Sequence, residues 1–219
     1  MARRSRPPAA STGEDGGLPA LLILLSIVTG LVDAVSYLGL NRIFVANMTG
    51  NVLFLGFALA GDTNLSAWES LLALAAFATG AWTVGRLVRR VPPRRTFVGV
   101  TAVHAILVAA ALVVALAADL RAGGAQAALI VLLAGGMGLQ NAAVRALGVP
   151  GLTTTTVLTS TLTGLVTDPP KSMGRRRVAS IAAMFIGALA GAALHLHAGL
   201  AAALVPALVL LAGIALVSW

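Results

Sequence analysis

The stretch FVANMTGNVLFLGFALAG, residues Phe44 to Gly61, decides how this chain folds. It is apolar enough to enter a lipid bilayer, but it has only 18 residues, and its first half is interrupted by Asn47, Thr49, Gly50 and Asn51. An α-helix needs about 20 residues to cross the roughly 30 Å hydrocarbon core. The stretch therefore predicts a segment that enters the membrane part-way and turns back.

A second stretch of the same kind runs from Leu152 to Val166 (LTTTTVLTSTLTGLV), about 109 residues further along. It is also short, and threonines interrupt it. Non-helical backbone at membrane depth is acceptable only where it is buried in protein or lines a wet cavity. We therefore expect the two re-entrant segments to meet inside the protein, and the functional centre to lie where they meet.

The composition indicates a polytopic membrane protein. Of the 219 residues, 58% are hydrophobic and only 10% are charged, which excludes an ordinary soluble domain. The absence of cysteine excludes disulfides and thiolate metal sites. The net charge of +8 comes from short basic runs between apolar blocks. Such runs set topology and contact anionic lipid, so we expect the lipid bilayer, and no nucleic acid, as a partner.

The predicted fold class is all-α, with six transmembrane helices and two re-entrant half-helix segments. Residues 1–17 are polar and rich in Pro, Gly and Ser, which predicts a disordered cytoplasmic tail before a single transmembrane domain over 18–219. The first apolar block is too long for a signal peptide, so we interpret it as a retained span. The six expected spans are 18–40, 67–88, 97–118, 125–147, 178–197 and 200–219.

The distribution of basic residues separates two topologies. If all eight segments crossed, the 15 Lys and Arg would divide 8 to 7 between the two sides. If the two short segments are re-entrant, 13 lie on the cytoplasmic side, and only Arg42 and Arg121 lie outside. The positive-inside rule favours the second arrangement, with both termini cytoplasmic in the inner (plasma) membrane.

The two halves of the chain resemble each other, at offsets of 107 to 110 residues. Residues 30–34 (GLVDA) align with 138–142 (GLQNA), residues 75–77 (AAF) with 182–184 (AAM), and Gly80 with Gly187. The repeats cover about 18–118 and 125–219. Because each contains three crossings, the second enters the membrane with the opposite orientation, as in many transporters whose sites lie near the midplane.

The runs GLVDAVSYL (30–38), VANMTGN (45–51) and GLQN (138–141), followed by the Thr-rich stretch, resemble the YoaK-like family of bacterial inner-membrane proteins. The resemblance covers roughly 18–218. Ser160 departs from the pattern, because a glycine is expected there. The resemblance implies a multi-pass membrane protein of a family without an established substrate or catalytic residue.

Asp33 is the acid that lies deep inside an apolar span. A carboxylate at that depth is costly unless it is paired, protonated or hydrated, which favours a functional role such as binding a proton or sodium ion. The structural alternative is that Asp33 accepts hydrogen bonds from the N-terminus of the half-helix that starts near Asn47. One residue can do both.

Other polar residues could line the path of a solute or ion. Alternatively, their side chains bond to their own helix or hold helices together. His104 is interpreted as a hydrogen-bonded packing residue or a proton relay. The candidate substrate- or ion-binding residues are Asp33, Asn47, Thr49, Asn51, Gln140, Asn141, Thr156, Thr159 and Thr161.

The sequence contains no P-loop, HExxH or GxSxG motif, so we expect neither a nucleotide-driven pump nor a hydrolase, and no cofactor or metal. The first functional hypothesis is a secondary transporter of an unidentified small solute, coupled to a proton or sodium ion through Asp33. The alternatives are a passive channel or facilitator, and a non-transport scaffold or sensor. The small loops are compatible with a homodimer.

Overall fold

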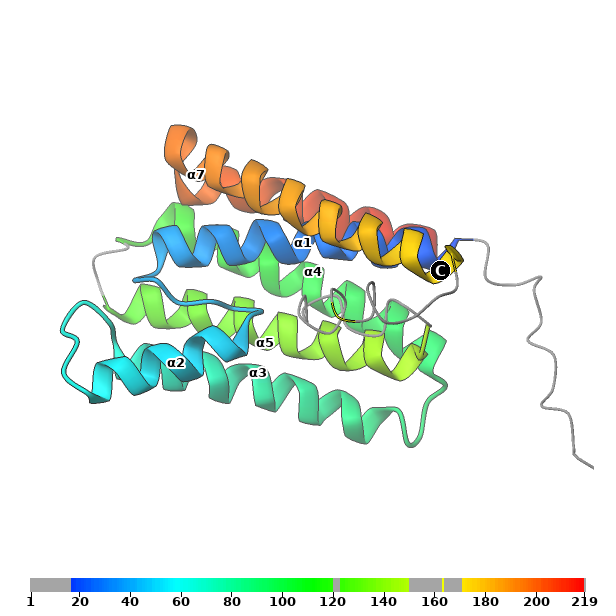
Figure 1. Cartoon of the computed structure of the whole chain (residues 1–219), viewed down its shortest axis with the longest axis horizontal. Helices are drawn as coiled ribbons and strands as arrows, with labels where there is room; N and C mark the ends of the chain where they lie inside the picture. The colour runs from blue at the N-terminus through cyan, green and yellow to red at the C-terminus, as the bar shows by residue number, and fades with distance from the viewer. Residues whose placement is uncertain (1–16, 120–122, 150–162, 164–170, 219) are drawn as a thin grey trace, which may run out of the picture.

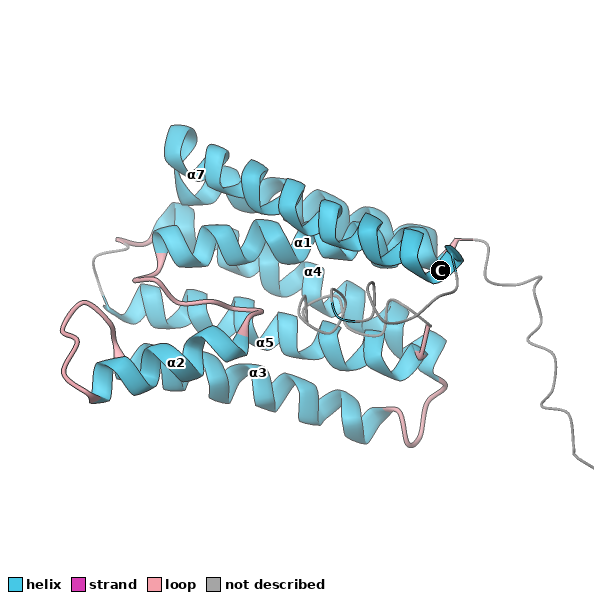
Figure 2. Ribbon diagram, in the orientation of Figure 1, coloured by secondary structure: helices cyan, strands magenta, loops and turns pink. Residues whose placement is uncertain are grey.

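A computed structural model describes residues 17–119, 123–149, 163 and 171–218, and this part of the chain is helical with short connections (Figures 1 and 2). Residues 1–16, for which a disordered tail was predicted, lie outside the described residues. The helices are α1 Leu18–Gly39, α2 Met48–Leu59, α3 Ala67–Leu87, α4 Pro93–Ala117, α5 Gly123–Leu147 and α7 Lys171–Ser218.

Five of these helices are long and apolar enough to cross a membrane, and α2 is the short one in the described part of the chain. The longest, α7, contains a break at Gly199, whose backbone angles are φ 87° and ψ 174°. Figure 1 shows α7 folding back there, so that its end lies near its beginning. The break falls between the two spans predicted over 178–197 and 200–219. The protein is therefore a multi-pass helical membrane protein.

Two helices begin earlier than the membrane spans predicted within them. Helix α4 begins at Pro93 instead of residue 97, because proline is favoured in the first turn of a helix, where its missing N–H is not needed. Helix α7 begins at Lys171 instead of residue 178. Its basic run was taken for a loop, but Arg, Lys and Met have high helix propensity. In both cases positive charge marked the end of the apolar block and not the end of the helix.

Charge is divided between the two ends of the bundle. Figure 1 shows the α3–α4 turn, the end of α5 and the start of α7 at one end. Those segments carry nine of the ten described arginines: Arg86, Arg89, Arg90, Arg94, Arg95, Arg145, Arg175, Arg176 and Arg177. The α2–α3 connection and the first turn of α3, at the other end, contain Asp62 and Glu69.

Helix α1 packs on α7 with direct backbone contact. A Cβ atom on Gly30 would collide with the carbonyl oxygen of Met184 and lie 2.6 Å from the nitrogen of Ala188. In return, a Cβ on Gly187 would collide with the carbonyl oxygen of Ile27. Only glycine allows two helix backbones to approach this closely.

Helix α5 makes the same kind of contact with α3. A Cβ on Gly138 would collide with the carbonyl oxygen of Phe77, and a Cβ on Gly80 would lie 2.9 Å from the nitrogen of Leu139. Helix α5 also packs on α4, whereas α1 makes few contacts with α5. Each of α1 and α5 is thus held by helices from the other half of the chain.

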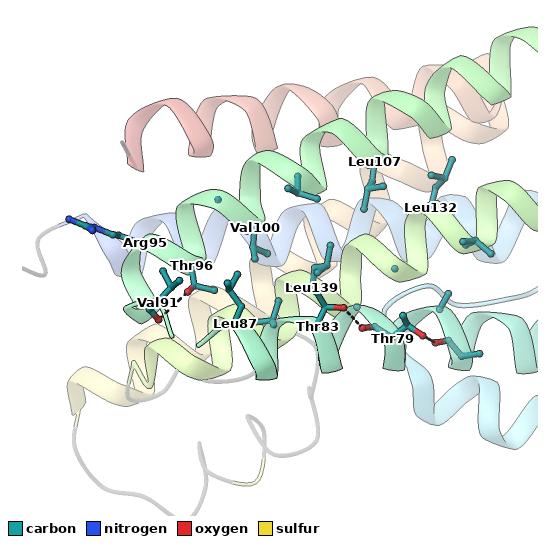
Figure 3. A pocket seen from close by; sticks show the side chains of 18 of the residues that line it. Thr79, Thr83, Leu87, Val91, Arg95, Thr96, Val100, Leu107, Leu132 and Leu139 are labelled. Carbon is teal, nitrogen blue, oxygen red and sulfur yellow. Dashed lines mark hydrogen bonds between the residues drawn. The ribbon is translucent and has the colours of Figure 1, made fainter. Parts of the chain in front are cut away.

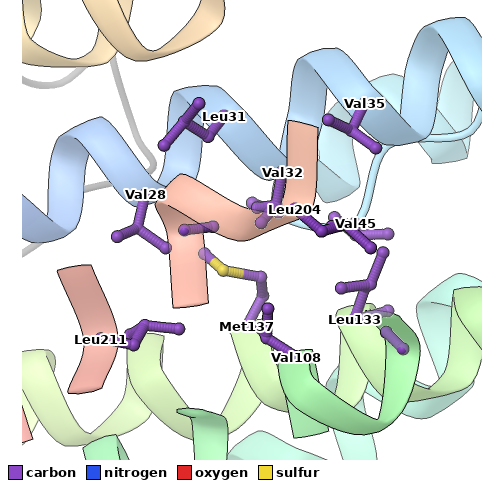
Figure 4. Packing of buried hydrophobic residues seen from close by; sticks show 14 of the residues in the cluster. Val28, Leu31, Val32, Val35, Val45, Val108, Leu133, Met137, Leu204 and Leu211 are labelled. Atoms are coloured by element: carbon purple, nitrogen blue, oxygen red, sulfur yellow. The ribbon is translucent and has the colours of Figure 1, made fainter. Parts of the chain in front are cut away.

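The hydrophobic core lies between the helix pairs just described. Figure 4 shows side chains of α1, α4, α5 and the second leg of α7 meeting there. The labelled members are fully or almost fully buried: Val28, Leu31, Val32, Val35, Val45, Val108, Leu133, Met137, Leu204 and Leu211. Val45 belongs to the connection between α1 and α2, so that connection is anchored in the core.

Candidate functional site

Asp33 lies in the last third of α1 and is buried, with only 6% of its surface exposed. Its carboxylate oxygen Oδ1 accepts hydrogen bonds from the backbone nitrogens of Val45, at 3.1 Å, and Ala46, at 2.7 Å. A buried carboxylate is tolerated where N–H groups replace its water shell, and two consecutive amides do so here.

The connection over residues 40–47 brings these amides to Asp33. The chain leaves α1 through Asn41 (φ 49°) and Arg42 (φ 61°), two consecutive left-handed residues that redirect the backbone. Asn41 is fixed by its Nδ2 atom, which donates to both carboxylate oxygens of Glu69 on α3, at 3.1 and 3.2 Å. The next residues return into the protein, because Ile43 and Val45 are fully buried.

Helix α2 begins part-way along the bundle and ends at the end of the bundle where α3 begins (Figure 1). Asn47 caps its N-terminus, with Oδ1 accepting from the backbone nitrogen of Gly50 at 3.4 Å. An N-cap side chain satisfies one of the free N–H groups of the first turn. The N-terminus of α2 and the amides before it therefore lie beside the carboxyl group of Asp33, where the helix dipole favours a negative charge.

Asn51 closes the same connection from inside α2. It is fully buried, its Oδ1 accepts from the nitrogen of Phe44 at 3.0 Å, and its Nδ2 donates to the carbonyl oxygen of Phe44 at 2.6 Å. The amide side chain thus pairs with both backbone groups of one residue, as a neighbouring strand would. This pairing satisfies both backbone groups of Phe44 without regular secondary structure.

Three aromatic rings that we did not select from the sequence cover this connection. Phe44 stacks on Tyr37 of α1, with centroids 5.0 Å apart, and on Phe54 of α2, at 5.8 Å. A Cβ on Gly50 would lie 2.7 Å from the ring of Phe44, so glycine makes room for the stack. The sequence spacing could have indicated that these rings lie near the site. Tyr37 is four residues after Asp33, and Phe54 is three residues after Asn51, so each pair lies on one helix face.

Gln140 belongs to a different polar pair. Its Oε1 lies 3.4 Å from Nδ1 of His104, between α5 and α4, and both residues are buried. Nε2 of His104 and Nε2 of Gln140 have no hydrogen-bond partner within the described protein. Gly136 leaves space for the imidazole, since a Cβ there would lie 2.5 Å from the ring.

The structure therefore brings only some of the predicted residues together. Asp33, Asn47 and Asn51 surround one connection, whereas Thr49 is exposed on the first turn of α2. Asn141 is half-buried on α5 and has a polar interaction of its own. Thr156, Thr159 and Thr161 lie outside the described residues, so where they sit relative to Asp33 stays a prediction.

The hydrogen bonds of Asp33 come from Val45 and Ala46, in the connection just before the helix N-terminus that the structural alternative named as the donor. A role of Asp33 in binding an ion or a solute stays a prediction. No group of three or more His, Asp or Glu side chains that could hold a metal ion occurs among the described residues. The described contacts tie the connection just before α2 to the buried carboxyl group of Asp33.

Comparison with known proteins identifies the family. The family model described as "Protein of unknown function (DUF1275)" matches residues 21–217. UPF0700 transmembrane protein YoaK of Bacillus subtilis (strain 168) is 35% identical over 148 residues, which are 68% of this chain and 65% of that relative. The match thus spans slightly less than two thirds of the relative's length. No solved structure matches the chain. The resemblance to YoaK is confirmed, and the chain belongs to the DUF1275 family of multi-pass membrane proteins.

Proposed function

We propose that this protein is a secondary transporter of a small solute in the inner membrane, and that the junction between Asp33 and α2 is its moving part. The observation that carries the proposal is the contact of a buried carboxyl group with two backbone amides that lie just before a helix too short to span. Helices interrupted near the midplane, with their termini directed at charged groups, are a recurrent design of secondary transporters.

In this proposal α2 is re-entrant. The short helix starts part-way along the bundle, and it ends at the end where α1 stops and α3 begins (Figure 1). The two legs of α7 then count as separate crossings on either side of Gly199, which gives six crossings together with α1, α3, α4 and α5. The segregation of arginines to one end supports this topology, with that end cytoplasmic.

An inverted repeat is supported by the glycine contacts. The alignment of the two halves equates Gly30 with Gly138 and Met184 with Phe77, and in each half the glycine meets the carbonyl oxygen of the equivalent partner. It also equates Gly187 with Gly80, and both meet backbone of the long helix that they pack against. Equivalent positions of the two halves thus make equivalent contacts. This is expected of an inverted repeat in which a helix of each half packs on a helix of the other half.

The coupling mechanism follows from the charge of Asp33. A carboxylate holds N–H donors about twice as strongly as a neutral acceptor does. Binding of a proton or sodium ion to Asp33 would weaken its hold on the amides of Val45 and Ala46. Helix α2 could then move relative to α1. Ion binding at Asp33 would in this way control whether the solute can reach the interior of the protein. An ion can shift such an equilibrium only by its difference in affinity between the two states.

The transport test compares wild type with Asp33→Asn, which keeps an oxygen acceptor but removes the charge. Proteoliposomes would be screened against a panel of amino acids, organic acids, sugars and inorganic ions, with and without an imposed pH or sodium gradient. We expect gradient-driven accumulation by wild type and loss of gradient dependence in Asp33→Asn. Downhill flux that is equal in both proteins would favour a passive channel. An absence of flux across the whole panel would favour a scaffold or sensor and would overturn the proposal.

The topology test uses two reporter fusions. A reporter fused after Arg95 should read cytoplasmic, and one fused after Gly61 should read extracytoplasmic. If α2 crossed the membrane instead, both signals would be exchanged.

A further inference from the structure

An apolar groove runs along the outside of the bundle between α3 and α4, with α5 as its floor. It has a volume of about 890 Å³, and its walls extend from Leu72 to Leu87 on α3 and from Arg95 to Leu107 on α4 (Figure 3). Fifteen residues of helix correspond to roughly 22 Å. Helices α3 and α4 barely touch each other, which leaves the groove open along its length.

The threonines among the described lining residues, Thr79, Thr83 and Thr96, already donate their hydroxyl hydrogens to backbone carbonyls. The hydroxyl of Thr79 donates to the carbonyl oxygen of Ala75 at 2.8 Å, and that of Thr83 donates to the carbonyl oxygen of Thr79 at 2.8 Å (Figure 3). The remaining walls are mostly aliphatic or glycine. A polar ligand would exchange its hydrogen bonds to water for few in this groove, whereas a hydrocarbon chain makes none in water and loses nothing by entering.

The two ends of the groove differ in charge. Arg95 is the one charged residue among the described lining residues, and it lies where α4 starts (Figure 3). Arg89 and Arg90 belong to the adjoining α3–α4 turn, and no acidic residue lines the groove. The acids of this part of the chain, Asp62 and Glu69, lie at the opposite end of α3. The groove is therefore apolar along its length and positively charged at the end where α4 starts.

We propose that this groove binds one acyl chain of an anionic phospholipid, with the lipid phosphate at Arg95. The argument rests on the match of shape and charge: a long, open, apolar trough suits a hydrocarbon tail, and a guanidinium at its end suits a phosphate. Basic residues next to a membrane-spanning helix attract anionic lipids. The site is separate from the junction at Asp33, and it does not depend on the protein being a transporter.

The test uses the full-length protein in nanodiscs that contain phosphatidylglycerol with a diazirine in its acyl chain, or the matching phosphatidylcholine. After illumination, mass spectrometry of peptides locates the cross-links. We expect labelling concentrated on the groove faces of α3, α4 and α5, and stronger with phosphatidylglycerol. Labelling spread evenly over all lipid-facing helices, with no preference for the anionic lipid, would overturn the proposal.

Two pairs of variants test binding of the acyl chain and binding of the lipid headgroup separately. Gly99 lines the groove and has open space around it, so Gly99→Leu should fill the groove and abolish its labelling; Gly85→Leu, equally unhindered on α3 but outside the groove, should not. Arg95→Gln should lower the preference for phosphatidylglycerol about five-fold, as expected for roughly 1 kcal/mol per basic residue. Its neighbour Arg94 does not line the groove, so Arg94→Gln should have little effect.

A second copy of the chain is the competing occupant. Native mass spectrometry of the same Gly99→Leu sample distinguishes it. If that variant shifts a dimer to a monomer while groove labelling persists, then the groove is a protein interface and the lipid proposal is wrong.

Discussion

Oδ1 of Asp33 lies 2.7 Å from the backbone nitrogen of Ala46, and this bond joins a long helix to the connection that leads into a short one. The contact spans 13 residues of chain and lies in the protein interior. It explains how an acid is kept inside an apolar span, and why the chain can leave α1 without a second helix starting at once. The following predictions test this bond and the backbone contacts that surround it.

Removing the carboxylate should destabilise the protein more than neutralising it. Asp33→Ala leaves the buried amides of Val45 and Ala46 without an acceptor, and each unsatisfied buried group costs about 1–3 kcal/mol. Asp33→Asn keeps a carbonyl oxygen in place and should lose less. Thermal unfolding of the purified proteins in one detergent would rank them as wild type, then Asn, then Ala. Equal melting temperatures for all three would contradict the hydrogen-bonding role.

Asn51 should matter for stability, whereas Thr49 should not. Asn51→Ala removes both bonds to the backbone of Phe44 inside the protein, which we expect to lower the unfolding free energy by about 1–3 kcal/mol. Thr49 is exposed on the same helix, so Thr49→Ala should stay within about 0.5 kcal/mol of wild type. Chemical denaturation in mixed micelles would measure both. A larger loss in Thr49→Ala would show that the connection is held differently.

The interhelix glycines of the two halves should behave alike. Gly30→Ala and Gly138→Ala each place a methyl group against a backbone carbonyl, which forces the helices apart and should cost about 1–3 kcal/mol. Gly56 has open space around it, so Gly56→Ala should be neutral or stabilising by about 0.4–1 kcal/mol. Melting temperatures of the three variants provide the comparison. A loss confined to one of the two interhelix positions would weigh against the proposed exchange of repeats.

The break in α7 should depend on glycine. Gly199 has φ 87° and ψ 174°, a region that residues with a Cβ adopt only under strain of about 1–3 kcal/mol. Gly199→Ala should therefore lower the melting temperature. Gly213 is the matched control, because it lies in the same helix without a positive φ and without close neighbours. If Gly199→Ala is as stable as Gly213→Ala, the two legs of α7 do not need this turn.

The sequence by itself determined the class of the protein, the approximate helix positions and the importance of residues 44–61. These follow from local properties, since hydrophobic length sets the spans and polar residues interrupt them. The family resemblance also came from contiguous residues, GLVDAVSYL and VANMTGN, and the family match over 21–217 confirms it. Charge was less informative about helix ends, because arginines continue helices beyond the apolar block, as at Arg94 and Arg175.

Only the tertiary structure decided which polar residues meet. Asp33 is paired with Val45 and Ala46, and Gln140 with His104, although the sequence grouped Asp33 and Gln140 in one site. The rings of Tyr37, Phe44 and Phe54, and the groove between α3 and α4, likewise depend on how helices lie against one another. The physical reason is that such contacts join residues from separate elements, and their geometry is set by packing. A local pattern shows that a group is buried, but it does not show against what.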